Sequence, residues 1–288
     1  MDTGKATHAG VTRRVLLMVG GITLVASYCH DPAAGTADAA RTRAAHPTPV
    51  PDPAGSARPP AARARVAARK ETVRTRRSGP GPRTAMRAPR GNAENLPMFH
   101  VADGHKTIAL TIDDGPSPVY TPQILRLLDK YRVTATFSMV GLQVACHPGV
   151  AREVAAAGHH IANHTWAHLD LAFLPPVAVA DQINRATGAI HQATGRVPTL
   201  FRAPYGAWSP AVLRYCTQTA MTPLAWSVDP RDWSRPGVAA IVGNIMRNTS
   251  TGAIILEHDG GGNRSETVAA LKIVLPRLLA AGYRFTTP

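Results

Sequence analysis

Cysteine is scarce in this sequence. The 288 residues include three cysteines, which are Cys29, Cys146 and Cys216. Their spacing fits neither a disulfide framework nor a cysteine-based metal knuckle. Whether Cys146 and Cys216 form a disulfide bond in an oxidising compartment is left open, because sequence alone does not give the distance between their Cα atoms. Internal repeats are also lacking, which argues against a solenoid or a propeller.

Long apolar runs are lacking as well. The run Val15–Tyr28 is shorter than the roughly 20 residues that a membrane span needs. Arg13 and Arg14 precede it and small residues follow it over Ala33–Ala40, which is the layout of a secretory signal. We therefore assign residues 1–40 as a signal peptide or N-terminal anchor. A cleaved signal ranks first, an uncleaved anchor second and a lipoprotein signal through Cys29 third; a buried helix is the alternative to export.

Large apolar residues are rare between residues 41 and 95, where alanine, proline and arginine dominate. Such a segment cannot bury enough surface to offset its ordering entropy, so we expect a disordered linker. Between Arg41 and Arg90 it carries 13 basic and 2 acidic residues. An exported linker of this kind would be attracted to anionic cell-surface polymers or lipid headgroups. The alternative is an arginine-rich tail without a partner.

The net charge of +14 is unevenly distributed along the chain. Residues 1–95 hold 16 basic and 6 acidic side chains, whereas residues 96–288 hold 16 and 12. The basic character therefore belongs mainly to the N-terminal third. Together with the export signal, this distribution argues against a nucleic-acid binder.

From residue 96 onward, apolar runs of strand length alternate with amphipathic segments of helix length, which is typical of parallel β/α units. Seven strands in roughly 190 residues match a barrel-like α/β fold of reduced size. The expected strands are Thr107–Ile112, Ala135–Val140, His160–Asn163, Leu200–Ala203, Thr222–Trp226, Ala253–Leu256 and Tyr283–Phe285. The expected helices are Thr121–Tyr131, Gly149–Ala157, Pro176–Thr194, Pro210–Ala220, Val238–Asn248 and Thr267–Ala281.

Polar residues follow the ends of these strands. Asp113 and Asp114 end the first apolar run, His164 follows the third strand and His258 follows the sixth. Parallel β/α folds collect their catalytic groups at the carboxyl ends of the strands, so we expect these side chains to meet. Taken alone, the pair of aspartates would more often be a solvated corner before the turn at Gly115.

His164 and His168 are spaced to share a ligand. On a helical turn, side chains at i and i+4 lie one above the other, so both imidazoles could reach one metal ion. With Asp114 as a third ligand, the set becomes two histidines and a carboxylate with an open position, as in catalytic zinc sites. Non-haem iron uses a similar triad, so the ligands alone do not fix the metal.

The remaining polar residues could supply proton transfer. A metal would acidify a water, and Asp113, not needed as a ligand, could accept its proton. Arg202 could keep Asp113 ionised and oriented. His258 is the candidate acid, and Asp232 could raise its pKa. For His258 alone, a hydrogen-bonded histidine at a strand end is the alternative.

The segment Arg202-Ala203-Pro204-Tyr205-Gly206 predicts a fixed turn whose backbone N–H groups could face a developing oxyanion. An ordinary surface turn is the alternative. Four large side chains could form the apolar wall of a sugar-sized pocket. They are Tyr205, Trp166, Trp233 and Leu256; for each, core packing is the alternative.

Five blocks in order resemble the polysaccharide deacetylases of carbohydrate esterase family 4, over roughly residues 105–287. The blocks are Thr111-Ile112-Asp113-Asp114-Gly115, His164-Thr165-Trp166-Ala167-His168, Arg202-Ala203-Pro204-Tyr205-Gly206, Asp229-Pro230-Arg231-Asp232-Trp233 and Ile254-Ile255-Leu256-Glu257-His258. The resemblance implies a distorted, incomplete (β/α) barrel of about seven strands, with residues 96–288 as the catalytic domain.

The resemblance also implies roles for single residues. Asp114, His164 and His168 would bind one divalent ion, usually zinc, with cobalt, manganese and iron as alternatives. Asp113 would be the base that Arg202 orients, and Asp232 would tune the acid His258. Tyr205 would give its backbone N–H to the oxyanion, and Trp233 and Leu256 would line the acetyl pocket. Glu257 departs from the family pattern and is expected to alter substrate reach.

The expected activity is hydrolysis of N-acetyl groups on N-acetylglucosamine-type units of a cell-wall or chitin-like polysaccharide, by attack of a metal-bound water. The expected enzyme is exported, monomeric and secreted or attached to the cell surface. Two alternatives stay open: an esterase for O-acetyl groups of xylan, and a non-catalytic module that binds the cell wall.

Overall fold

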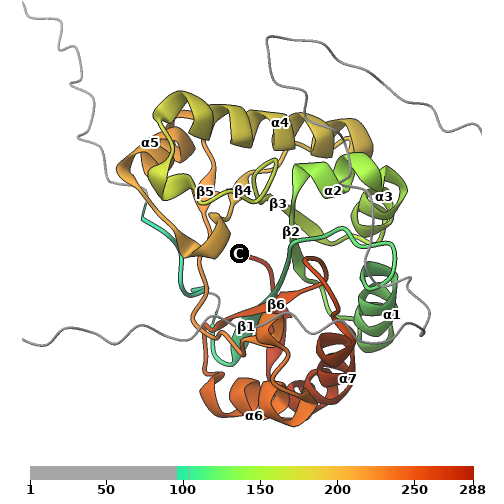
Figure 1. The fold of residues 1–288 in the computed structure, drawn as a ribbon. Coiled ribbons are helices and arrows are strands. Elements are labelled where there is room, and N and C mark those ends of the chain that lie inside the picture. Colours follow the sequence, from blue (N-terminus) through green and yellow to red (C-terminus); the bar gives the residue numbers. More distant parts are fainter. Residues whose placement is uncertain (1–95, 103) are drawn as a thin grey trace, which may run out of the picture. The chain divides into compact units, whose positions relative to one another are not determined.

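The computed structural model describes residues 96–102 and 104–288, so the predictions for residues 1–95 lie outside the described residues. Seven parallel strands form one curled sheet in the order β5-β4-β3-β2-β1-β6, with β7 beside β1. The helices surround the strands in Figure 1. An isolated bridge between Val228 and Ile255 lies between the two ends of the sheet, which do not pair as strands in the described part. The expected incomplete (β/α) barrel is confirmed.

The strands are short and the helices longer. The strands are β1 (Thr107–Asp113), β2 (Thr136–Met139), β3 (His160–Asn163), β4 (Leu200–Phe201), β5 (Thr222–Pro223), β6 (Ile254–His258) and β7 (Arg284–Thr286). The α-helices are α1 (Thr121–Tyr131), α2 (Gly141–Cys146), α3 (Pro148–Ala156), α4 (Pro176–Thr194), α5 (Pro210–Gln218), α6 (Val238–Asn248) and α7 (Ser265–Ala280). Single 3₁₀ turns are η2 (Leu171–Phe173), η3 (Pro204–Gly206) and η4 (Asp232–Ser234). Within this part of the chain, no helix combines the length and apolar character needed to cross a bilayer.

Helix boundaries follow residues that can be read from the sequence. Proline occupies the first turn of α1, α3, α4 and α5, where its missing N–H costs no hydrogen bond. Helix α4 ends at Gly195, whose φ of 71° suits the left-handed residue that closes a helix. The predicted bounds of α1, α4 and α6 are confirmed to the residue.

The predicted strand Thr222–Trp226 is too long, because the chain changes its pairing partner after Leu224. Strand β5 covers Thr222–Pro223 rather than Thr222–Trp226. The Leu224 N–H still donates to the Phe201 carbonyl, but the Ala225 N–H donates to Met98, outside β4. Helix α2 was not predicted, since six residues are too few to display a helical period.

The sheet is buried on both faces, as parallel sheets are. All seven residues of β1 are buried. Cys216 of α5 lies in a separate apolar cluster with Val212 and Met221, and it is a free thiol whose pKa burial raises to about 12. A Cys146–Cys216 bridge, left open by the sequence, is therefore not formed.

Candidate active site

The polar residues that follow the strands meet in one pocket of about 390 Å³ at the carboxyl ends of β1, β3 and β6. This gathering is the one expected for a parallel β/α fold. The lining residues are Asp113, Asp114, His164, His168, Ala203, Tyr205, Trp226, Asp229, Trp233, Leu256 and His258.

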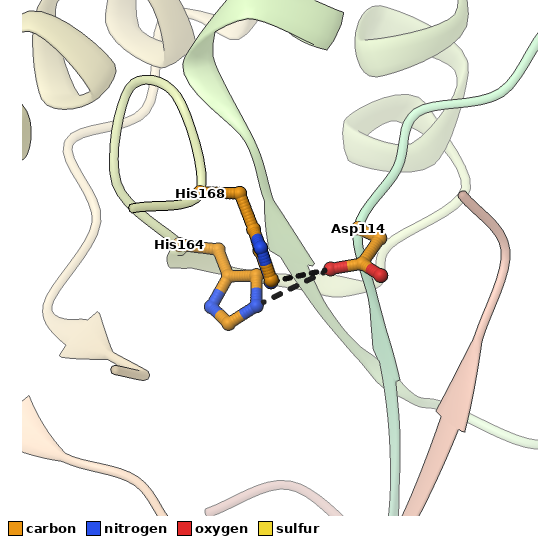
Figure 2. A group of neighbouring side chains, drawn as sticks. All are labelled: Asp114, His164 and His168. Carbon is orange, nitrogen blue, oxygen red and sulfur yellow. Dashed lines mark ion pairs between the residues drawn. The ribbon is translucent and has the colours of Figure 1, made fainter. Parts of the chain in front are cut away.

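Three of these residues form a candidate metal centre. Ligand atoms of Asp114, His164 and His168 all lie within 4.8 Å of one another. The Asp114 Oδ1 atom is 3.4 Å from His164 Nε2 and 3.1 Å from His168 Nε2. Figure 2 shows both imidazoles pointing at the same carboxylate oxygen from one loop, while Asp114 comes from the end of β1.

The histidine pair does not lie on a helical turn, so that prediction is wrong. His164 and His168 belong to a loop after β3 in which Thr165 and His168 have φ values of 66° and 53°. Side-chain hydrogen bonds replace the helical ones: Asn163 Oδ1 accepts from Thr165 N at 2.8 Å, and Thr165 Oγ1 accepts from His168 N at 3.0 Å. Short polar side chains at such positions favour turns over helices. The two imidazoles converge nevertheless.

Helix α2 holds this loop in place. The N–H groups of Gly141 and Leu142 in its first turn donate to the carbonyls of Thr165 and Trp166, both at 2.9 Å. A Cβ atom on Gly141 would lie 2.6 Å from the Trp166 ring, so the close approach requires glycine. The unpredicted helix is therefore part of the framework of the site.

Each ligand histidine is oriented through its other ring nitrogen. His164 Nδ1 lies 2.8 Å from the Arg202 carbonyl oxygen. A carbonyl only accepts, so Nδ1 carries the hydrogen and the neutral ring offers the Nε2 lone pair to the centre. His168 Nδ1 lies 3.2 Å from the Tyr205 hydroxyl. Such outer partners fix the tautomer and the ring orientation of metal ligands.

The three residues fit a divalent cation. Asp114 Oδ1 is a buried atom that two imidazole nitrogens face, His164 Nε2 at 3.4 Å and His168 Nε2 at 3.1 Å. Burial would raise the pKa of Asp114, but hydrogen bonds to His164 and His168 and nearby positive charge hold it well below its ordinary value. One ionised carboxylate and two imidazoles form a donor set that suits zinc.

Asp113 is not part of this group. Its Oδ1 atom accepts a hydrogen bond from Arg202 Nη1 at 2.8 Å, and both side chains are buried. Arg202 is locked by further bonds from its guanidinium to Thr111 Oγ1 at 2.7 Å and to the Ala225 carbonyl at 2.9 Å. The structure thus brings Arg202 to Asp113, as the sequence suggested.

Asp232 and His258 form a second couple. His258 Nδ1 lies 2.7 Å from Asp232 Oδ1, and the His258 backbone N–H donates to Asp232 Oδ2 at 2.9 Å. Burial lowers the pKa of His258, but the hydrogen bond and charge of Asp232, with the charges of Asp114 and Asp113, raise it to about 9. The imidazole is therefore held protonated near neutral pH.

The pocket wall differs in part from the prediction. Tyr205, Trp233 and Leu256 line it as expected. Trp166 does not, because its ring packs against Gly141 and lies 4.4 Å below the Arg185 guanidinium. Trp226 takes its place. The sequence predicts Trp226 as the last residue of a strand. No local sequence pattern distinguishes a tryptophan that faces a pocket from one that packs in the core.

Glu257 does not reach the pocket. It is fully buried and absent from the lining residues, so the expectation that it alters substrate reach is wrong. Side chains alternate along β6, and Leu256 and His258 take the pocket face.

Comparisons with known proteins identify the family of this chain. The family model described as polysaccharide deacetylase matches residues 100–224. A chitooligosaccharide deacetylase of Bradyrhizobium sp. (strain ANU 289) is 39% identical over 208 residues, which is 66% of this chain and 95% of that protein. This chain belongs to the polysaccharide deacetylase family, carbohydrate esterase family 4.

Other polysaccharide deacetylases match similarly. A peptidoglycan-N-acetylglucosamine deacetylase of Bacillus cereus is 41% identical over 191 residues, covering 66% of this chain and 89% of that protein. The crystal structure of a peptidoglycan N-acetylglucosamine deacetylase superposes with a TM-score of 0.64 at 33% identity, covering 66% of this chain and 89% of that one. These relatives are named for two different acetylated glycans.

Proposed function

We propose that this protein is a metal-dependent N-deacetylase of polymers that contain N-acetylglucosamine-type units. One observation carries the proposal: a buried base candidate, a protonated acid candidate and a fitting metal triad line the same pocket in a chain of the polysaccharide deacetylase family. A pocket of about 390 Å³ suits one sugar residue with its acetyl group better than a whole oligomer.

Asp114, His164 and His168 would hold the ion, which we propose to be zinc, with cobalt, manganese or iron as alternatives. A bound divalent cation supplies Lewis acidity, which polarises a carbonyl oxygen and lowers the pKa of water. His164 keeps the correct tautomer for this task through the Arg202 carbonyl. The ligand set leaves a position open for substrate, as catalytic sites require.

The protein side chains would move the protons. Asp113, held by Arg202, accepts a proton from the attacking water as the new carbon–oxygen bond forms. The backbone N–H of Tyr205 donates to the acetyl oxygen while that oxygen carries negative charge. His258, held by Asp232, gives a proton to the sugar nitrogen as the carbon–nitrogen bond breaks. The products are acetate and a free amine on the glycan.

The test is acetate release from a panel of N-acetylglucosamine oligomers, peptidoglycan and acetylxylan. We expect release from the first two, its loss with a chelator and its recovery with zinc. Asp114→Asn is the control variant, since it replaces an ionised ligand by a weaker, neutral one of nearly the same volume. Release from acetylxylan alone would favour the O-acetyl esterase. A zinc-loaded protein that binds cell-wall glycan without releasing acetate would be the non-catalytic module.

We also propose that the protein is exported and acts as a monomer at the cell surface. This proposal rests on the sequence of residues 1–40 and on the basic residues of 41–95, which would contact anionic cell-surface polymers. Cell fractionation of the full chain and of a variant with Arg13 and Arg14 replaced by glutamine tests export. Unchanged cytoplasmic recovery of both would contradict it.

A further inference from the structure

Glu257 is a buried acid that the proposed reaction does not use. It stands in β6 between Leu256 and His258, which face the pocket, and its own side chain is fully buried. Fully burying an ionised carboxylate is costly unless charged or hydrogen-bonding partners compensate. Glu257 therefore needs such a partner or a proton.

No partner for an ionised Glu257 exists in the described part of the chain. Neither carboxyl oxygen receives a hydrogen bond from an N–H or O–H group there. Arg264 is the nearby cation, but its guanidinium donates to the backbone carbonyls of Gly260, Gly261 and Trp233. The group that lies within hydrogen-bonding reach is another carboxyl, that of Asp232.

Two carboxyl groups form a hydrogen bond only when one of them carries a proton. Asp232 accepts from His258 Nδ1, from the His258 backbone N–H and from Thr267 Oγ1, all within 2.9 Å, so its ionised form is well stabilised. Glu257 has no comparable donors. Burial, followed by the negative charge of Asp232, raises the pKa of Glu257 well above its ordinary value. The proton thus belongs to Glu257.

We propose that Glu257 is a positioning residue that, as a neutral acid, donates a hydrogen bond to Asp232 and so adjusts how firmly Asp232 holds the His258 imidazolium. The inference rests on the proposed function, in which His258 gives up a proton during each turnover. A hydrogen bond to Asp232 disperses its negative charge, which makes His258 a stronger acid than Asp232 alone would allow. Glu257 would therefore favour release of the proton to the leaving amine.

Several other charges act on this pair and must stay unchanged in a test. Asp229 and Arg264 act on Glu257, and residues of other elements act on His258. The groups acting on His258 are Asp113, Asp114, His168, Asp232 and Asp259. A variant at position 257 leaves all of these side chains in place.

Two variants of the full chain separate a neutral Glu257 from an ionised one. Glu257→Gln keeps a donor of the same shape, and Glu257→Leu removes the donor and fills the space. The measurement is the NMR titration of the His258 ring in chelator-treated protein, assigned with His258→Ala. We expect Gln to leave the His258 pKa within about 0.3 unit and Leu to raise it by about 0.5–1 unit, the effect of one lost hydrogen bond.

The direction in which the His258 pKa changes distinguishes a neutral Glu257 from an ionised one. If Glu257 is ionised, both substitutions remove a negative charge and lower the His258 pKa, which would overturn the proposal. A merely structural role would leave it unchanged in both. Should the Leu variant not fold, as judged by circular dichroism, Glu257→Met takes its place with the same expected rise in the His258 pKa. A fall in the Gln variant, or no change in the apolar variant, would overturn the proposal. The titration needs no activity, so its result stands apart from a failure of the proposed function; in an active enzyme, the alkaline limb of kcat/KM should move with it.

Discussion

Two buried carboxylates at the site, Asp113 and Asp232, are held by different kinds of partner. Asp113 is hydrogen-bonded to Arg202, which is fully buried. Burial lowers the pKa of Arg202 from its ordinary value, but a guanidinium stays charged near neutral pH. Asp232 is bonded to His258, whose charge depends on pH. A base needs a constant neighbour, whereas an acid must be able to lose its proton and regain it.

Substitution of Asp113, the proposed base, should have the largest effect on deacetylation. In Asp113→Asn the amide cannot accept a proton, so we expect kcat/KM for deacetylation to fall by about 10²–10⁴-fold. Zinc binding should persist, because Asp113 lies outside the ligand group. Acetate release and zinc content measure the two effects. Loss of zinc in Asp113→Asn equal to that in Asp114→Asn would show that both aspartates bind the ion.

The loss of activity on substitution of His258, the proposed acid, should depend on the leaving group of the substrate. In His258→Ala we expect a fall of about 10²–10⁴-fold on an N-acetyl substrate, because a poor amine leaving group needs a proton. An O-acetyl ester has a better leaving group and should lose only about tenfold. Acetate release from chitin oligomers and from acetylxylan gives the comparison. Equal losses on both substrates would contradict the role of His258 as acid.

Removal of the fixed cation should cost more stability than disturbance of the titratable pair. Arg202→Leu removes the cation that pairs with Asp113, whose side chain is buried, so we expect about 3–5 kcal/mol less unfolding free energy. Asp232→Asn should cost about 1–3 kcal/mol, since His258 can shed its proton. Urea unfolding at pH 7 measures both. A smaller loss in Arg202→Leu than in Asp232→Asn would reverse the comparison.

Of the two couples, the one between Asp232 and His258 should make stability depend on pH near neutrality. The folded pKa of His258, about 9, lies above its ordinary value of 6.5, so its contribution is fully present below pH 6.5 and is lost as pH rises through 9. The shift corresponds to about 3 kcal/mol. Urea unfolding between pH 6 and 10 in a chelator measures this loss, because a cation on Asp114 would cancel part of the charge that raises the pKa.

His258→Ala is the reference for this titration, because other buried groups also change charge. Burial and nearby negative charge raise the pKa of Asp259 to about 7, even though a hydrogen bond from Thr121 opposes the shift. The difference between wild type and His258→Ala isolates His258. A difference that stays constant from pH 6 to 10 would contradict the assignment.

The sequence predicted those parts of this contrast that depend on strand order. Asp113, Arg202 and His258 each follow or end a strand, and a parallel sheet brings such residues to one edge. It could not predict the histidine loop correctly, because the loop that contains the left-handed residues Thr165 and His168 is held by tertiary bonds to α2 and α4. Spacing at i and i+4 indicated two imidazoles that do converge on Asp114, but for the wrong local reason.

Residues whose role depends on which way a buried side chain points were the hardest to predict. Trp166 and Trp226 both lie near polar motifs, yet one packs behind the loop and the other lines the pocket. Glu257 is adjacent to His258 in sequence but faces the opposite side of β6. Alternation along a strand predicts that reversal once the strand is known to run through His258, and the expected strand ended at Leu256.

The contrast between a fixed and a replaceable partner extends to the two ligand histidines. His164 donates to a backbone carbonyl, whereas His168 faces the hydroxyl of Tyr205, whose side chain is 70% exposed. In Tyr205→Phe, water can replace the hydroxyl beside His168. We therefore expect zinc affinity to fall by only about tenfold, the smallest loss that is typical when a metal ligand loses its hydrogen-bonding partner. Competition with a chromogenic chelator measures it, and Tyr215→Phe, which loses a bond to Asn184 on the surface, is the matched control. Equal affinities in the two variants would mean that the Tyr205 hydroxyl does not orient His168, and that the turn at Tyr205 serves the site through its backbone alone.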